Sequence, residues 1–212
     1  MQDHAARPAA VLWDMGGILF RYFTELLLDV GKARGWPLER LPLGPTGPGP
    51  DPVYEAMDRG ELTEPDYVAH IEKVFASEGI VFSLHGNLPV AEARRPETWA
   101  VIEKIKRSGL KQGLLTNDAT LWLGRRWWEG WRFVEYFDAI IDVQTLGVRK
   151  PAPEPYLACA KAVGASPAEC LFVDDMHANC KGAEGVGMQS HWFDIACPRA
   201  STTSLLERLG LV

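Results

Sequence analysis

The chain has 212 residues, of which 47% are hydrophobic and 24% charged, and its formal net charge is −6. This length suits one large domain, or a core domain with a modest insertion, and the hydrophobic fraction is sufficient for a buried core. The acidic balance, with no basic stripe, argues against a nucleic-acid partner. The four cysteines lack C-x-x-C spacing, so we expect buried free thiols rather than a zinc site.

The N-terminal residues show no signal for export. They lack a cationic start followed by a long apolar run, and no apolar run in the chain approaches the ~20 residues that cross a bilayer. We therefore expect a reduced, soluble, cytoplasmic protein with no membrane partner. The sequence leaves open whether it is a monomer or a homodimer.

Short apolar runs recur along the chain and predict buried strands. They cover residues 9–13, 112–116, 138–143, 170–173 and 189–193. Because these runs do not alternate with polar residues, they suit strands covered on both faces of a parallel sheet. Helix-like segments accompany them at residues 96–108, 155–163, 179–186 and 203–209. This alternation predicts an α/β fold with helices on both sides of the sheet.

Residues 21–94 interrupt this alternation. A helical segment begins at Phe23, and two more are expected at residues 53–59 and 65–77. Between them, residues 44–52 consist mostly of proline and glycine, so we expect no regular structure there. The pattern predicts a helical insertion after the first strand, returning to the sheet near Arg94.

Asp14 is the best-placed carboxylate in the chain. It lies at the carboxyl end of the first predicted strand, where open parallel sheets bind their ligands. Gly16 and Gly17 would let the following loop turn tightly and bring backbone N–H groups close to a phosphate. Because Asp-x-Gly-Gly after a strand is also an ordinary turn, this motif alone leaves both interpretations open.

Thr116 and Lys150 give weaker signals. Thr116 ends a predicted strand, and its hydroxyl could donate to a phosphate at the start of the next helix. The following Asn117-Asp118 equally suits a simple helix cap. Lys150 precedes Pro151 and could be a fixed counter-charge for phosphate and carboxylate, or a solvated surface lysine.

Asp174 and Asp175 form the strongest single motif. Two adjacent carboxylates at the end of a buried strand repel each other unless a cation lies between them. Hard oxygen ligands of this kind suit Mg²⁺. Asn179, about one helical turn later, could brace the site.

The four motifs occur in one order, with Asp14, Thr116, Lys150 and Asp174 separated by 102, 34 and 24 residues. In this order the chain resembles the haloacid dehalogenase superfamily of hydrolases. It is most similar to the branch with a small helical cap that includes the phosphatase domain of soluble epoxide hydrolase. The resemblance runs from Val11 to His191. Its most specific part is Val-Asp-Asp-x-x-x-Asn, at residues 173–179, followed by Gly-Ala at 182–183 and Gly-Met at 187–188.

The resemblance implies a Rossmann-like, three-layer α/β/α core made of residues 1–20 and 94–212, with a helical cap at residues 21–93. It also implies a Mg²⁺-dependent phosphatase for a small phosphorylated metabolite, in which Asp14 forms an aspartyl-phosphate that water then hydrolyses. Mg²⁺ would be held by Asp14, the backbone carbonyl of Gly16, and Asp175, with Asp174 bonding directly or through water. The phosphate would be bound and stabilised by Gly16, Gly17, Thr116, Asn117 and Lys150.

Gly16 departs from the family pattern. Most family phosphatases have an aspartate there, which acts as general acid and base, and such help accelerates a reaction ~10²–10⁴-fold. We hypothesise that the enzyme favours good leaving groups, such as acyl or anomeric phosphates, or takes its proton donor from the cap or from water. Glu61, Asp66 and His70 are candidates by location only.

Two other functions stay open. In a 2-haloacid dehalogenase Asp14 would attack carbon, but that chemistry needs no metal, so Asp174 and Asp175 argue against it. A phosphate-binding or regulatory protein with weakened catalysis is favoured by Gly16, but the presence of the other motif residues argues against it. His177 could line the site, and the tryptophans between residues 122 and 131 predict a packed helix or a partner surface. The sequence does not identify the substrate.

Overall fold

A computed structural model describes residues 7–82, 88, 93–117, 119, 133–143 and 146–212. Its centre is a parallel five-stranded sheet in the order β3-β2-β1-β4-β5. The strands are β1 (Ala10–Trp13), β2 (Lys111–Thr116), β3 (Ala139–Asp142), β4 (Cys170–Asp174) and β5 (Gln189–Trp192). The predicted strands are confirmed, with each boundary within one residue. The predictions made for Asp118 and for the tryptophan-rich segment at 122–131 lie outside the described residues.

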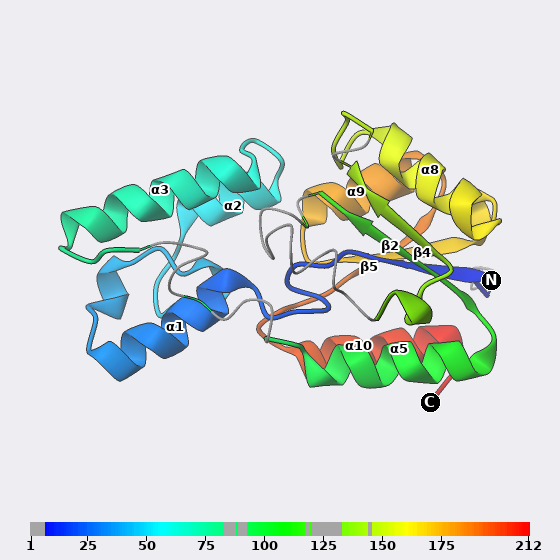
Figure 1. Ribbon diagram of the computed structural model, residues 1–212, viewed down its shortest axis with the longest axis horizontal. Coiled ribbons are helices and arrows are strands. Elements are labelled where there is room, and N and C mark those ends of the chain that lie inside the picture. The colour runs from blue at the N-terminus through cyan, green and yellow to red at the C-terminus, as the bar shows by residue number, and fades with distance from the viewer. Residues whose placement is uncertain (1–6, 83–87, 89–92, 118, 120–132, 144–145) are drawn as a thin grey trace, which may run out of the picture.

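The sheet is buried on both faces because successive side chains of β1 point to opposite sides. Val11 and Trp13 belong to a core cluster that includes residues of α5 (Pro96–Ser108) and α10 (Pro198–Leu209). Ala10 and Leu12 belong to a second cluster that includes residues of α8 (Pro153–Val163) and α9 (His177–Gly185). Figure 1 shows these two helix layers above and below the strands. The predicted three-layer α/β/α architecture is therefore confirmed.

Proline sets several helix starts earlier than the periodic pattern indicated. The helix expected from residue 155 begins at Pro153, and the helix expected from residue 203 begins at Pro198. Proline suits the first turn because its missing N–H has no intrahelical partner there, and its fixed φ is already helical. Glycine ends α5 at the expected residue 108, because Gly109 takes the left-handed conformation with φ +80°.

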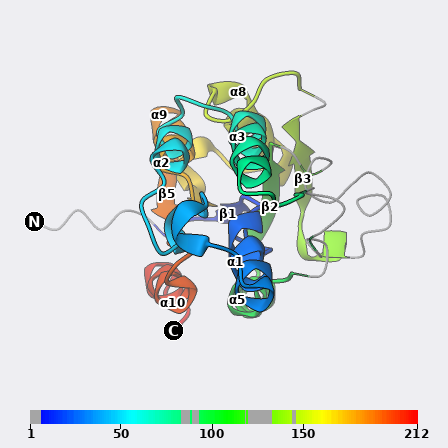
Figure 2. The same ribbon diagram turned by 90° about the vertical axis from the view of Figure 1, so that its left-hand side faces the viewer.

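The inserted segment forms three main helices that lie apart from the sheet, beyond its carboxyl end (Figures 1 and 2). They are α1 (Phe23–Arg34), α2 (Pro52–Asp58) and α3 (Glu64–Ser77). Aromatic rings join them: the ring of Tyr67 lies 5.6 Å from that of Tyr54 and 5.9 Å from that of Phe23, between centroids. Contacts of this kind add to the stability gained from burial alone.

The proline- and glycine-rich stretch is more ordered than expected. Residues Gly44–Thr46 form a 3₁₀ turn, and Pro52 is the first residue of α2, so the prediction of no regular structure is wrong at both places. The cause is Asp51, a buried carboxylate. It accepts hydrogen bonds from the backbone of Gly44 (3.0 Å) and Tyr54 (2.9 Å), and from the Tyr67 hydroxyl (2.5 Å). An N-cap carboxylate of this kind stabilises the start of α2, whose first helical position is Pro52.

A buried ion pair joins the inserted helices to the core. Nη2 of Arg95 lies 2.5 Å from Oε2 of Glu25, and these side chains are only 4% and 9% exposed. Nε of Arg95 also donates to the carbonyl oxygen of Gly17 at 2.9 Å. One guanidinium therefore connects the loop after β1, the start of α1 and the start of α5.

Replacing Arg95 by methionine is expected to lower the free energy of unfolding by ~3 kcal/mol, because it leaves the buried Glu25 carboxylate with only the longer, 3.7 Å ion pair to Arg21. Urea denaturation followed by circular dichroism measures this change. The double variant Arg95→Met/Glu25→Gln removes both charges and should recover part of the loss. A single variant within about 1 kcal/mol of wild type would show that the pair does not matter for stability.

The structure also tests the predictions about the cysteines and about membrane-spanning segments. Cys159, Cys170 and Cys180 are buried free thiols, as expected, but Cys197 is exposed just before α10. The prediction of buried thiols is therefore wrong for Cys197. Within the described ranges, every helix is too short or too polar to cross a bilayer.

Candidate active site

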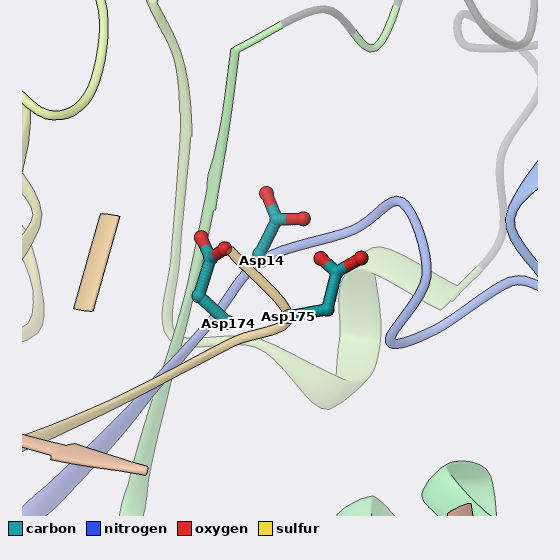
Figure 3. Close-up of side chains that lie close together, drawn as sticks. All are labelled: Asp14, Asp174 and Asp175. Atoms are coloured by element: carbon teal, nitrogen blue, oxygen red, sulfur yellow. The ribbon is translucent and has the colours of Figure 1, made fainter. Parts of the chain in front are cut away.

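Three carboxylates meet where β1 and β4 end. The two strands are neighbours, and their register pairs Trp13 with Val173, so Asp14 follows beside Asp174. Carboxylate oxygens of Asp14, Asp174 and Asp175 all lie within 4.8 Å of one another. Figure 3 shows the three carboxyl groups gathered at one side of these strand ends. The parallel arrangement thus brings together two motifs that are 160 residues apart in the chain.

Lys150 is the cation of this cluster. Its Nζ donates to Oδ1 of Asp14 (2.5 Å), to Oδ2 of Asp174 (2.9 Å) and to the carbonyl oxygen of Leu115 (3.2 Å). The side chain is 1% exposed, which rules out the alternative of a solvated surface lysine. Burial alone would lower the pKa of Lys150, but the carboxylates of Asp14 and Asp174 outweigh it and raise the pKa. The ammonium therefore stays charged.

Asn117 positions Lys150 by a pair of hydrogen bonds to its backbone. Oδ1 of Asn117 accepts from the backbone N–H of Lys150 at 2.9 Å, and Nδ2 donates to the carbonyl of Lys150 at 3.2 Å. Both polar ends of the amide are thus used. The sequence motif suggested a phosphate ligand or a helix cap at Asn117 and gave no indication of this clamp. It joins residues 33 positions apart.

Asp174 and Asp175 have different surroundings although they are adjacent. Asp174 is fully buried and accepts from the backbone N–H of Met176 (2.9 Å), from Nδ2 of Asn179 (3.1 Å to each oxygen) and from Lys150. Asn179 thus braces the acidic pair, as the sequence suggested. Asp175 is 7% exposed, and no side chain in the described ranges donates to its carboxylate. Of the two adjacent aspartates, Asp174 therefore holds Lys150.

Negative charge exceeds positive charge in this cluster. Burial, opposed by Lys150 and assisted by Asp174, raises the pKa of Asp14 to about 7. Burial and the charges of Asp174 and Asp14 also raise the pKa of Asp175 well above its usual value. Three carboxylates with one ammonium leave an uncompensated charge that a divalent cation would offset. The oxygen donors and their spacing therefore fit Mg²⁺.

The two glycines of the loop after β1 have opposite steric surroundings. Gly17 has φ +72°, and a Cβ there would lie 2.5 Å from Oδ2 of Asp175, so both conformation and space require glycine. A Cβ at Gly16 would meet nothing within 4 Å. Thr116 is buried at the end of β2, next to β1 in the sheet. The loop therefore has room for a side chain at the position where the general acid is missing.

The suggested proton donors from the inserted helices are engaged elsewhere. Glu61 forms an ion pair with Arg59 (2.7 Å), and Asp66 accepts from the Thr63 hydroxyl (2.6 Å) at the start of α3. These hydrogen bonds lower the pKa of both carboxyls, so near neutral pH a smaller fraction of either carries a proton to donate. His70, on α3, lines neither of the two cavities described below.

His177 holds two elements together. Its backbone N–H donates to Oδ1 of Asp58 at 2.6 Å, its Nδ1 lies 2.9 Å from Oδ2 of Asp58, and its ring stacks on Trp192 at 4.4 Å between centroids. Asp58 is the last residue of α2, so this contact attaches the inserted helices to the first residue of α9. His177 therefore lies beside the acidic cluster without being a lining residue of either cavity.

Two cavities are lined by residues of the cluster or by their hydrogen-bond partners. One, of about 370 Å³, lies between residues 44–58 and the end of β5 and reaches Asp175; we call it the β5 cavity. The other, of about 290 Å³, is lined by Asn117, Arg149, Lys150 and residues 57–64. Both have walls from the inserted segment and from the core. A ligand at the acidic cluster would therefore touch both parts of the chain.

Comparisons with known proteins agree with this geometry. Residues 9–187 match the family model described as haloacid dehalogenase-like hydrolase. The chain is 34% identical to phosphatase MT3486 of Mycobacterium tuberculosis over 210 residues, which cover 88% of this chain and 87% of that protein. It is 28% identical to fructose-1-phosphate phosphatase YqaB of Escherichia coli, over 83% of this chain and 81% of that protein.

Solved structures share the fold at lower identity. The L-2-haloacid dehalogenase RSc1362 aligns with a TM-score of 0.59 and 20% identity, over 95% of this chain and 98% of that structure. A haloacid dehalogenase family enzyme of Bacteroides thetaiotaomicron, solved with magnesium and inorganic phosphate, aligns with a TM-score of 0.51 and 18% identity. That match covers 88% of this chain and 94% of the other. At such identities the similarity concerns the fold alone.

Proposed function

The chain belongs to the haloacid dehalogenase-like hydrolases, and from this membership we propose that it is a Mg²⁺-dependent phosphatase of a small phosphorylated metabolite. The observation that carries the proposal is the cluster of Asp14, Asp174 and Asp175 around a fully buried lysine. Two relatives aligned over most of their length have names that describe phosphatases, which supports the same activity.

The proposed reaction uses Asp14 as the nucleophile. One oxygen of its carboxylate attacks the phosphorus, the bond to the leaving oxygen breaks with its electron pair, and an aspartyl-phosphate forms. Water then attacks the phosphorus and returns the free carboxylate and inorganic phosphate. Lys150 favours this step in two ways, because it lowers the pKa of Asp14 against the effect of burial and places a positive charge beside the transferring group. Thr116, at the neighbouring strand end, would donate its hydroxyl to a phosphate oxygen.

The residues that would hold Mg²⁺ are Asp14, the carbonyl of Gly16, and Asp175. Asp174 would contribute through water, because its oxygens already accept from Lys150, Met176 and Asn179. A bound Mg²⁺ supplies Lewis-acid stabilisation of the charge on the phosphoryl oxygens. Asp175 is the carboxylate most available to a metal, since no described side chain donates to it.

We further propose that residues 21–93 act as a cap over a core of residues 1–20 and 94–212. Helices α1, α2 and α3 pack on one another away from the sheet, which supports a separate unit. The Asp58–His177 contact holds this unit against the edge of the sheet where Asp14 lies. A cap in this position would shield the reacting phosphate from bulk water.

Dehalogenation is the weaker candidate. The structural similarity to a 2-haloacid dehalogenase concerns the fold only, and attack on carbon would need no cation at Asp174 and Asp175. A regulatory phosphate-binding protein is favoured by Gly16 alone. The intact ion pair between Lys150 and Asp14 argues against it, because this pair suits an ionised nucleophile.

Phosphate release from acetyl phosphate, measured with Mg²⁺ and again with excess EDTA, tests the proposed function. We expect release that EDTA abolishes and added Mg²⁺ restores, because the carboxylates need a cation to bind a phosphate dianion. Release that is unaffected by EDTA would contradict the metal assignment. Halide release from 2-chloropropionate without phosphate release would favour the dehalogenase, and neither product would favour the regulatory alternative.

A further inference from the structure

The β5 cavity opens from the acidic cluster toward the inserted segment. It has a volume of about 370 Å³ and reaches Asp175 at its inner end. Residues 44–58 form one wall, and residues 192–195, where β5 ends, form the other. A phosphate bound beside Asp14 and Asp175 would therefore have space on this side for the rest of its ester. This space is enough for a small organic group.

Among the described residues, the charges that line this cavity all have one sign. Five of the thirteen described lining residues are acidic, and none of the thirteen is lysine or arginine. Asp51 and Asp58 are already used, by the start of α2 and by His177 respectively. Glu55 is exposed, and its carboxylate forms no hydrogen bond or ion pair with described residues. Asp194 uses Oδ1 for the backbone N–H of Ala196 (2.9 Å). Glu55 and Asp194 therefore offer acceptors to a ligand.

Tyr54 supplies a donor in the same cavity. Its side chain belongs to a residue only 8% exposed, it lines the cavity, and its hydroxyl has no hydrogen-bond partner in the described ranges. Burial, followed by the charges of Asp175 and Asp58, raises the pKa of Tyr54, so the phenol stays protonated. A hydroxyl at a cavity wall without a partner in the described ranges is free to donate to a ligand oxygen.

Trp192 forms a flat apolar part of the wall. It is 44% exposed, its ring stacks on His177, and its Nε1 donates to the carbonyl of Asp175 at 2.7 Å. The ring is thereby fixed next to the acidic cluster. Such a face suits the C–H surface of a polyol or a cationic amine.

Resting on the proposed phosphatase function, we propose that the β5 cavity binds the leaving group, and that this group is an uncharged polyol or an amine-bearing alcohol without a second anion. Hydroxyls of the ligand would donate to Glu55 and Asp194 and accept from Tyr54. An ammonium group of the ligand would supply the positive charge that the described lining residues lack. A second phosphate or a carboxylate would meet carboxylates with no counter-charge. Like-charge contacts of this kind discriminate strongly between ligands.

Three substrates with the same two-carbon skeleton test the proposal: 2-aminoethyl phosphate, 2-hydroxyethyl phosphate and phosphoglycolate, which end in an ammonium, a hydroxyl and a carboxylate. We expect kcat/KM for phosphoglycolate to be at least ~10-fold below that for 2-hydroxyethyl phosphate, with 2-aminoethyl phosphate equal to it or better. Isothermal titration of the Mg²⁺-loaded Asp14→Asn variant with the same three phosphates should give the same order of affinities. Equal values for all three, or a preference for phosphoglycolate, would overturn the proposal.

Variants separate the cavity from general charge effects. Glu55→Gln/Asp194→Asn should reduce the ratio of kcat/KM for 2-hydroxyethyl phosphate to kcat/KM for phosphoglycolate several-fold; we call this ratio the gap. Tyr54→Phe should raise KM for 2-hydroxyethyl phosphate more than it changes kcat. The matched control Glu39→Gln/Glu72→Gln removes the same charge from exposed positions of the inserted segment that do not line the cavity, and it should leave the gap unchanged. If both double variants narrow the gap equally, the cavity is not responsible.

The same experiment distinguishes this proposal from the proposed function. The acetyl group of acetyl phosphate has no hydroxyl, no ammonium and no second anion, so it tests none of the proposed polar contacts in the cavity, and its Mg²⁺-dependent hydrolysis reports on the phosphatase alone. If acetyl phosphate is hydrolysed and the three esters have equal kcat/KM values, only the assignment of the cavity is overturned. If acetyl phosphate is not hydrolysed, the proposed function fails, while the titrations still decide which phosphates the cavity accepts.

Discussion

Asp14→Asn is expected to reduce the rate of phosphate release from acetyl phosphate by ~10⁴-fold or more, because an amide oxygen is a poor nucleophile toward phosphorus. The substitution is nearly isosteric, and Lys150 keeps its hydrogen bond to Asp174, so the fold should persist. Acid quenching of the wild-type reaction with labelled acetyl phosphate should trap a phosphoprotein that is absent in Asp14→Asn. A thermal unfolding curve of the variant verifies that it is folded.

The matched control is Asp29→Asn. Asp29 pairs with Arg21 on the exposed side of α1 and is 54% exposed, so its loss removes the same charge far from the chemistry. It should change the rate less than twofold, because exposed ion pairs contribute ~0–1 kcal/mol. If Asp14→Asn retains a tenth of the wild-type rate, another group is the nucleophile and the assignment of Asp14 is wrong.

Gly16→Asp is expected to raise kcat/KM for phenyl phosphate, an ester with a poor leaving group, by ~10²-fold, the lower end of the range for general acid–base help. The structure permits the substitution, because a Cβ at this position has nothing within 4 Å and the residue has no left-handed φ. The increase in kcat/KM should become smaller as the pKa of the leaving alcohol falls, and it should vanish for acetyl phosphate. Rates for a series of substituted phenyl phosphates measure this dependence.

Gly16→Asn separates proton transfer from simple filling of space. It has nearly the same shape as Gly16→Asp but no acidic proton, so it should leave turnover of phenyl phosphate close to wild type. Equal gains from both substitutions would mean that packing or loop order, rather than acid catalysis, was limiting. No gain from Gly16→Asp would mean that glycine is not the cause of any limitation on poor leaving groups.

Local sequence patterns were sufficient to predict the strands and helices and to place the motif residues at the ends of strands. Apolar runs without alternation predicted all five strands, since a strand covered on both faces must be apolar at every position. Asp14, Thr116 and Asp174 could be placed at strand ends for the same reason. Helix starts were less accurate at Pro153 and Pro198, because proline in a first turn signals a start that hydrophobic spacing does not.

The roles of several polar side chains depended on contacts between distant segments. Lys150 could have been a surface residue until the fold brought it to Asp14, 136 positions away, and the clamp from Asn117 depends on the same approach. Glu61 and Asp66 were reasonable proton donors by location, but their nearest partners are Arg59 and Thr63. A short-range pattern contains no information on which of these partners a side chain meets.

The sequence by itself determined the sheet, its covering helices, the order of the motifs and the membership of the family, because each depends on residues close together in the chain or on their order. Only the tertiary structure decided the distribution of charge around the site. Asp174 accepts hydrogen bonds from Lys150, Met176 and Asn179, whereas no described side chain donates to Asp175. Tyr54, Asp194 and Trp192 line one cavity, whose described lining residues include no lysine or arginine. Hydrogen bonds and charge interactions act over a few ångströms of space, so they follow the packing of the fold rather than the distance along the chain.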